Sequence, residues 1–209
     1  MTPLTPLHHL QQHPRAGSQG VGIAALIFRY FRYFLRYFSS THRTDLSRFR
    51  GTLKIFVKTT LADNRVVSVT ACHELFEMVI DPIANLWAEA ADGTEYAYEM
   101  CDPVEEDTFL VDGIEMSNFV HPSWFEPFKH PPGTKFDHLG LLKNPFSMTK
   151  GGYVIIKKKG KVSEHFGSKK KEKRFAKEDR YGHRSEYRKP HGLVIKPRRV
   201  RTAVERRAA

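Results

Sequence analysis

The chain has 209 residues, of which 40% are hydrophobic and 27% are charged, and its formal net charge is +11. This length allows one domain with a sizeable core plus extensions. The two cysteines, Cys72 and Cys101, cannot build a disulfide framework or a CxxC zinc site, and no uncharged apolar run reaches the roughly 18 residues of a membrane-spanning helix.

Charge is distributed unevenly along the chain. Residues 1–44 contain five arginines and no acid, residues 45–156 contain 9 basic and 17 acidic residues, and residues 157–209 contain 20 basic and 6 acidic residues. An acidic centre between two basic ends indicates a folded domain with charged tails. We predict three parts: an N-terminal extension (1–50), a domain (51–156) and a C-terminal tail (157–209).

The N-terminal extension contains one candidate helix, residues 24–38, with the sequence AALIFRYFRYFLRYF. At about 100° per residue its three arginines lie close together and its phenylalanines lie on the opposite side. Such a helix can bind a membrane surface through Phe28–Phe38, and the acid-free start also has the composition of a transit peptide. We favour two other hypotheses, a helix that packs on the domain or on a partner, and a translated segment without a role.

The domain is expected to begin with a strand followed by a helix. Residues 51–61 are rich in β-branched and aromatic residues, which predicts a strand, and residues 62–65, ADNR, predict the turn after it. Residues 66–80 predict a helix that stops before Asp81-Pro82, because a residue that precedes proline disfavours the helical conformation.

If the helical path continues to Asp81, four ionisable side chains share one arc of about 100°. They are His73, Glu74, Glu77 and Asp81. The arc can be the solvated face of a surface helix, but the helix offers no lysine or arginine to pair with its three acids, which repel one another. A divalent cation would relieve this repulsion and use His73 and Glu77, one turn apart, as two ligands.

The segments after the helix predict a small antiparallel system. Residues 94–102 and 107–120 alternate between polar and apolar residues as strands do, and Asp112-Gly113 is a hairpin turn signal. Residues 121–140, rich in proline and aromatics, predict a long loop that packs through its rings and walls a cleft. Residues 151–161 predict one more short strand, so the domain is expected to be α+β.

One motif on the helix carries a resemblance to a known group of proteins. HELFE (73–77) departs by one residue from the zincin signature HExxH, with Glu77 in place of the second histidine. The longer pattern, HELFEMVIDP followed by Trp87, DGTEYAYEMCD and VDGIEMSNFVHPSWF, resembles a zincin-like group of uncharacterised bacterial and phage proteins. That group is related to secreted proteins with the pattern HExxExxxDP, W and GEIxDxC. The resemblance covers residues 51–153.

The resemblance implies a zincin-like fold with a metal-site helix and a metal-dependent, peptidase-like hydrolase. It implies that His73, Glu77 and Glu99 bind the metal ion and that Glu74 is the general base that acts on metal-activated water. Zinc is the expected metal and a peptide the expected substrate. A His-Glu-Glu set consists of harder ligands than the usual His-His-Glu set, so iron, manganese and calcium are alternative metals. The secreted relatives have further cysteines that this chain lacks, and we therefore expect a cytoplasmic or virion-associated protein.

Other residues compete for the third ligand position. Cys101 offers a soft ligand and Asp102 a hard one. For Cys101, however, we favour the role of a small, buried hydrophobic residue. Asp81 is expected to bind backbone groups at the end of the helix. His121 and His138 have no spacing relation to the motif and are expected to be structural.

The C-terminal tail is strongly basic from Lys157 onward. Low apolar content and high charge predict disorder. Through Lys157–Arg207 such a tail would bind nucleic acid or another polyanion in a salt-dependent manner, although it can also be a solvated tail or dock on the acidic domain. The alternative function is therefore a non-catalytic structural or virion-associated protein that contacts nucleic acid.

Overall fold

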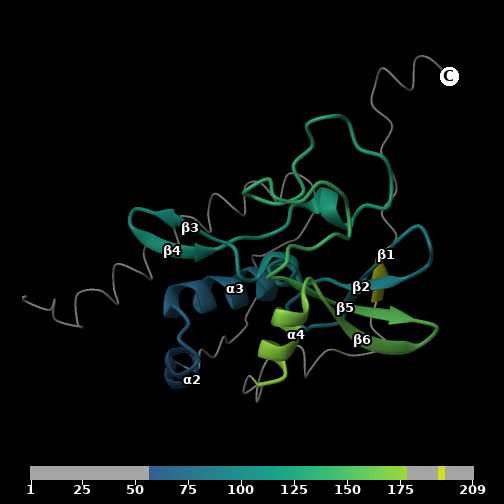
Figure 1. The fold of residues 1–209 in the computed structure, drawn as a ribbon. Coiled ribbons are helices and arrows are strands. Elements are labelled where there is room, and N and C mark those ends of the chain that lie inside the picture. Colours follow the sequence, from purple (N-terminus) through teal and green to yellow (C-terminus); the bar gives the residue numbers. More distant parts are fainter. Residues whose placement is uncertain (1–56, 178–192, 196–209) are drawn as a thin grey trace, which may run out of the picture.

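The computed structural model describes residues 57–177 and 193–195 (Figure 1). The predicted N-terminal extension with its helix 24–38, the predicted membrane-surface segment Phe28–Phe38 and most of the tail beyond residue 177 lie outside the described residues. In the described part, no helix combines the length and the apolar character that a membrane span requires. This part has an α+β fold, as expected.

A five-stranded sheet, in the order β6-β5-β2-β1-β7, forms one end of the described structure (Figure 1). Neighbouring strands are antiparallel, except that β7 runs parallel to β1. The strands are β1 (Leu86–Glu89), β2 (Glu95–Ala97), β5 (Tyr153–Lys158), β6 (Lys161–Phe166) and β7 (Leu193–Ile195). The middle of the sheet therefore joins segments that lie far apart in the sequence.

The helix α3 (Val67–Ile80) forms where the sequence predicts it. It buries Cys72, Phe76 and Val79 in the main hydrophobic core. It ends at Asp81, whose N–H donates to the Glu77 carbonyl at 2.9 Å. The carboxylate of Asp81 accepts hydrogen bonds from the N–H groups of Asn85 at 3.1 Å and of Leu86, the first residue of β1, at 3.0 Å. The predicted role of Asp81 at the helix end is thus confirmed.

The segment before α3 is a helix, α2 (Val57–Ala62), so the predicted strand is wrong over its described residues. Val57 and Leu61 are exposed, and a strand here would need a neighbour to satisfy its backbone groups, whereas a helix satisfies them internally. Asn64 adopts a left-handed conformation (φ 54°), which asparagine tolerates. The predicted ADNR turn is therefore present, but it joins two helices.

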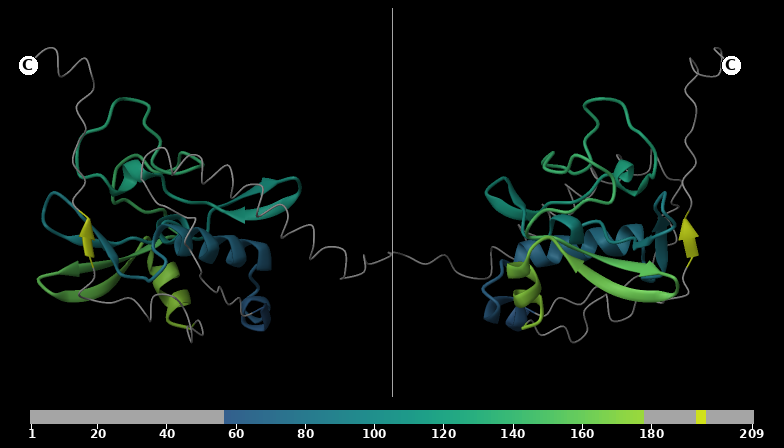
Figure 2. Two further views of the ribbon diagram at one scale, coloured as in Figure 1. Left: turned by 180° about the vertical axis from the view of Figure 1, so that it is seen from behind. Right: turned by 45° about the vertical axis from the view of Figure 1, so that its right-hand side comes forward.

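A two-stranded hairpin, β3 (Thr108–Val111) with β4 (Ile114–Ser117), lies at the other end of α3 from the sheet (Figure 2). Its turn residues Asp112 and Gly113 have φ values of 49° and 79°, as a type I′ turn requires. The hairpin is bound to α3, because Ser68 Oγ donates to the Glu115 carbonyl at 2.7 Å and the Ser117 N–H donates to Cys72 Sγ at 3.0 Å. The hairpin prediction is confirmed.

The long segment between β4 and β5 has little regular structure beyond the short helix η3 (Pro122–Phe125). As predicted, it packs through aromatic rings. Phe125 stacks on Tyr98 with ring centroids 3.9 Å apart, and Phe146 lies 4.6 Å from Tyr96. This segment therefore covers the sheet through ring contacts on residues of and near β2.

The basic segment after residue 156 is folded as far as residue 177, so the prediction of disorder from Lys157 is wrong there. It forms the end of β5, the whole of β6 and the helix α4 (Lys169–Phe175). The rings of Tyr153, Phe166 and Phe175 pack together, with Phe175 centred 4.9 Å from each of the other two. Lys171 is 1% exposed and forms a 2.5 Å ion pair with Glu105.

Gly152 allows the start of β5 to pass directly over the short helix η2 (Asp102–Val104). A Cβ atom there would lie 2.0 Å from the carbonyl oxygen of Pro103, which is backbone and cannot rotate away. We therefore expect Gly152→Ala to lower the free energy of unfolding by about 3 kcal/mol, the upper part of the range for overpacking. Urea unfolding followed by circular dichroism measures this, with Ser163→Ala on the exposed face of β6 as the control. A loss below about 1 kcal/mol would show that η2 can move aside.

Candidate metal centre

Two of the predicted ligands, His73 and Glu77, lie one turn apart on α3 and are both buried. Glu77 is 1% exposed and His73 is 6% exposed, and His73 Nε2 lies 3.3 Å from Glu77 Oε1. The solvated-face interpretation of this arc is therefore wrong, because these side chains point into the protein. Glu74, the next residue on the same arc, is partly exposed.

The segment just before and within η2 supplies the other half of the site. The Cys101 N–H donates to Glu77 Oε1 at 3.2 Å, and Asp102 Oδ1 lies 3.2 Å from His73 Nε2. Cys101 and Asp102 are 0% and 2% exposed. The link between Cys101 and Glu77 joins residues 24 positions apart, so the core packing of α3 against this segment creates the site.

The ligand atoms of His73, Glu77 and Cys101 all lie within 4.8 Å of one another. Among the described residues this buried group is the one that could hold a metal ion. Imidazole nitrogen, carboxylate oxygen and thiolate sulfur are all ligands that zinc accepts. A second buried carboxylate lies beside the group, because Asp102 Oδ1 is 3.2 Å from His73 Nε2.

The electrostatics of the group favour bound protons. Burial, and then the charge of Asp102, raise the pKa of Glu77 well above its usual range, and Glu99 adds to the shift. Burial lowers the pKa of His73, but the charges of Glu77 and Asp102 outweigh this effect and the net pKa is raised well above 6.5. Burial also raises the pKa of Cys101. A divalent cation would replace such protons, as metal ions do when they bind.

Glu99 is the predicted ligand that lies outside the group of mutually close ligand atoms. It is 3% exposed, and its charge raises the pKa of both Glu77 and Asp102, so it lies near them. Its role as a ligand stays a prediction. Cys101 takes its place in the group, although the sequence favoured a purely apolar role for this cysteine.

The structure contains a second polar cluster that the sequence analysis missed. Glu105, 7% exposed, forms ion pairs with Arg65 at 2.7 Å and with Lys171 at 2.5 Å. Glu105 lies at the end of η2, Arg65 in the loop before α3, and Lys171 on α4. No spacing pattern connects them, and only the fold brings them together. They attach the end of η2, which carries Asp102, to the loop before α3 and to α4.

His121 and His138 lie in an aromatic environment. The His138 ring stacks on Phe119 with centroids 5.0 Å apart, and the His121 ring lies 5.9 Å from the same phenylalanine. Burial lowers the pKa of His121 to about 4, so this side chain is neutral near pH 7. Both histidines pack as ring side chains and lie outside the candidate metal group.

Compared with known proteins, the chain matches no family model, no curated protein and no solved structure. The zincin-like resemblance thus rests on the motifs of the sequence and stays a prediction.

Proposed function

We propose that this protein is a zincin-like metalloprotein that binds one divalent metal ion through His73, Glu77 and a third ligand from residues 99–102. The observation that carries the proposal is the buried group of imidazole, carboxylate and thiol within 4.8 Å, beside a second buried carboxylate. An uncompensated cluster of buried acids is costly. A dication would offset that cost.

Zinc is the metal that this set of ligands favours. A thiolate and an imidazole are soft and borderline ligands, which suit zinc better than calcium or manganese. With Cys101 in the group, the set is softer than the His-Glu-Glu set of the resemblance. Because the pKa values of Glu77 and Cys101 are raised, metal binding would release protons, and the affinity should increase with pH.

The proposed activity is hydrolysis of a peptide or a similar bond. A bound zinc ion would supply a Lewis acid. Glu74 is partly exposed and follows His73, the most exposed of the three grouped ligands, on α3. Its proposed role is to accept a proton from the attacking water.

Metal content and hydrolysis test this proposal together. Elemental analysis of the purified full chain should find about one zinc ion per molecule, and a casein-derived peptide mixture should be cleaved. Glu74→Gln keeps the shape of the side chain but removes its basicity, so it should retain the metal and lose at least about 100-fold in hydrolysis rate. A metal-free wild-type protein would contradict the metal site, whereas a metal-loaded protein without hydrolysis would contradict only the activity.

A second candidate function is binding of a polyanion such as single-stranded nucleic acid. It is supported by the exposed cations of the β5–β6 hairpin and α4, which we call the basic surface: Lys158, Lys159, Lys161, Lys169, Lys170, Lys173, Arg174 and Lys177. Residues 157–177 contain ten basic and two acidic residues. Binding of a folded cationic surface to nucleic acid should weaken steeply with salt, because counterions are released.

Removing three of these cations tests the second function. The variant with alanine at Lys159, Lys161 and Lys170 should bind a single-stranded oligonucleotide more weakly, and the slope of log affinity against log salt should fall by about 2. The charge-matched control places alanine at Lys129, Lys135 and Lys143, outside the basic surface. Equal losses in the two triple variants would indicate net charge rather than this surface.

A further inference from the structure

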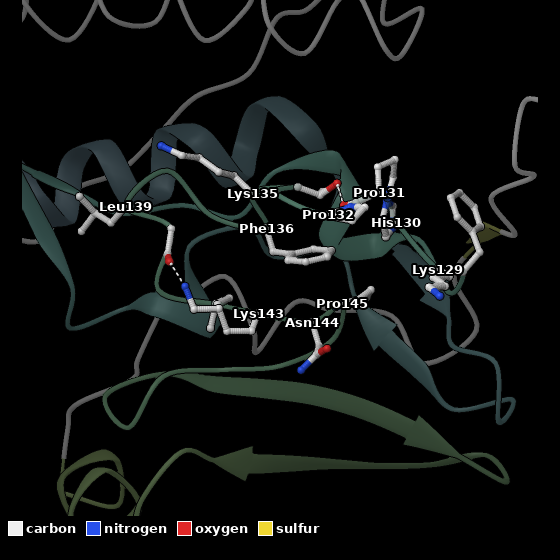
Figure 3. A pocket seen from close by; sticks show the side chains of 15 residues that line it. Lys129, His130, Pro131, Pro132, Lys135, Phe136, Leu139, Lys143, Asn144 and Pro145 are labelled. Carbon is white, nitrogen blue, oxygen red and sulfur yellow. Dashed lines mark hydrogen bonds between the residues drawn. The ribbon is translucent and has the colours of Figure 1, made fainter. Parts of the chain in front are cut away.

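A cavity of about 610 Å³ lies in the long segment between η3 and β5, far from α3 in the sequence. Residues between Phe128 and Pro145 form its lining (Figure 3). None of the candidate metal ligands lines it. Its volume falls within the range of about 300 to 1,000 Å³ that is typical of small-molecule sites.

The charged lining of this cavity is entirely cationic. Lys129, Lys135 and Lys143 line it, and no acid does. Figure 3 shows the three lysines on different sides of Phe136. None of them forms an ion pair with a described residue, whereas Lys157, Lys158 and Lys171 elsewhere in the fold all do. Lys143 Nζ donates to the Gly140 carbonyl at 2.8 Å, but none of the three has an acidic partner among the described residues. Three such cations around one hollow favour a ligand with more than one negative charge.

The remaining lining offers flat apolar surfaces. Phe136 and Leu142 are 6% and 5% exposed and form part of the wall. The ring of His130 lies 5.3 Å from Phe136 and 5.1 Å from Phe128. These rings and the neighbouring prolines present faces and edges on which a planar ring can pack.

One buried polar atom of the lining lacks a hydrogen bond. The side chain of His130 is 9% exposed, and its Nε2 atom has no hydrogen-bond partner among the described residues. It lies 3.6 Å from a carboxylate oxygen of Glu126, which is outside the lining and is too far for a hydrogen bond. Nε2 therefore has no hydrogen bond within the described residues, and the Glu126 carboxylate is the charged group beside it.

The walls of the cavity are held in place by a buried polar pair. Asn118 Nδ2 donates to Asp137 Oδ2 at 2.9 Å, and Asp137 Oδ1 accepts from the Leu142 N–H at 2.8 Å. Asn118 Oδ1 accepts from the Leu139 N–H at 3.3 Å. Both side chains are 0% exposed. The hollow is thus fixed by hydrogen bonds on the side that contains Leu139 and Leu142, so a ligand would meet a preformed wall.

We propose that this cavity binds a small molecule that joins a planar aromatic ring to a phosphate group, such as a nucleoside monophosphate. The positive charge of the three lysines around the cavity attracts the phosphate, and the rings of Phe128, His130 and Phe136 pack on the planar part. A phosphate matches three cations better than a carboxylate, because it carries up to two negative charges. The site is separate from the candidate metal centre and does not depend on it.

Calorimetric titration of the full chain with AMP, adenosine and inorganic phosphate tests this proposal. AMP should bind more tightly than adenosine or phosphate alone, and its affinity should fall as salt is added. The variant with alanine at Lys129, Lys135 and Lys143 should bind AMP about tenfold more weakly, as three partly solvated charge contacts allow. The charge-matched variant with alanine at Lys159, Lys161 and Lys170 should bind AMP as the wild type does.

Four results would overturn the proposal. They are the absence of AMP binding at millimolar concentration, equal affinity for AMP and adenosine, equal affinity for AMP and inorganic phosphate, and equal losses in the two triple variants. A single-stranded oligonucleotide serves as the competing ligand. If it binds far more tightly than AMP and loses this affinity with Lys129, Lys135 and Lys143, the cavity belongs to a nucleic-acid surface and the small-molecule assignment is wrong.

Discussion

Lys171→Met is expected to lower the free energy of unfolding by about 3 kcal/mol. The variant keeps the apolar stem but removes the charge that pairs with Glu105 in a site where both side chains are almost fully buried. Removal of one partner from a buried ion pair typically costs about 3–5 kcal/mol, because the other charge is left without compensation. The lower end applies here, since Arg65 still pairs with Glu105. Urea unfolding followed by circular dichroism provides the measurement.

The adjacent Lys170→Met is the matched control, because Lys170 is exposed on the same helix. It should change the free energy of unfolding by less than about 0.5 kcal/mol. Adding Glu105→Gln to Lys171→Met should recover part of the loss, since it removes the buried charge. An additive loss in the double variant would mean that packing, rather than charge, explains the effect.

The dependence of stability on acid pH provides a second test of the same ion pair. Burial would raise the pKa of Glu105, but Lys171 and Arg65 lower it from 4.5 to about 2. A lowered pKa in the folded state stabilises the protein above the unfolded value, and this contribution is lost as the pH falls from 4.5 towards 2. The stability of Lys171→Met should therefore depend less on pH in this interval than that of the wild type.

His73→Ala should reduce the metal content from about one equivalent to nearly zero. The candidate group has three ligands, so loss of the imidazole would leave two protein ligands, too few to hold a zinc ion tightly. Metal that binds only the folded state also stabilises it. A chelator should therefore lower the melting temperature of the wild type and leave that of the variant almost unchanged. Elemental analysis and thermal melts measure the two effects.

His165→Ala is the control for this experiment, because His165 is exposed on β6 and outside the candidate group. It should keep the metal and the response to the chelator. If His73→Ala still contains a full equivalent, the ion lies elsewhere. Glu99→Gln and Cys101→Ser, measured beside it, would identify the third ligand by which of them loses metal.

Local signals explain the elements that the sequence predicted correctly. Asp81-Pro82 ends α3 because of a steric effect that needs no tertiary contact. Asp112-Gly113 closes the β3–β4 hairpin because both residues tolerate positive φ, at 49° and 79°. In each case one or two residues determine the conformation, so one sequence suffices to predict it.

Two predictions failed where distant contacts outweigh local preference. Residues 57–62 are helical because α2 contacts α3 and no described strand pairs with this segment. The lysine-rich segment 157–177 is folded because three rings and one buried ion pair hold it to the sheet and η2. Counting charges could not separate Lys171, at 1% exposure, from its exposed neighbours Lys170 and Glu172.

The candidate site was only half predictable for the same reason. Helical periodicity alone places His73 and Glu77 on one arc. The proposed third ligand comes from residues 99–102, which follow the β1–β2 hairpin, and which side chain reaches His73 and Glu77 depends on how the chain turns at Cys101 into η2. Sequence reasoning identified the segment and its three candidates, Glu99, Cys101 and Asp102. It favoured Glu99, whereas the structure groups Cys101 with His73 and Glu77, because which side chain reaches the site depends on packing.

The parallel pairing of β7 with β1 has a consequence for synthesis of the chain. Leu86 pairs with Leu193, so a ribosome adds more than one hundred residues between the two partners. At about 5–20 residues per second, β1 waits roughly 5–20 s for this neighbour. During that time one edge of β1 offers unpaired backbone groups to other chains. The nascent protein therefore exposes this edge of β1 until its last described strand is made.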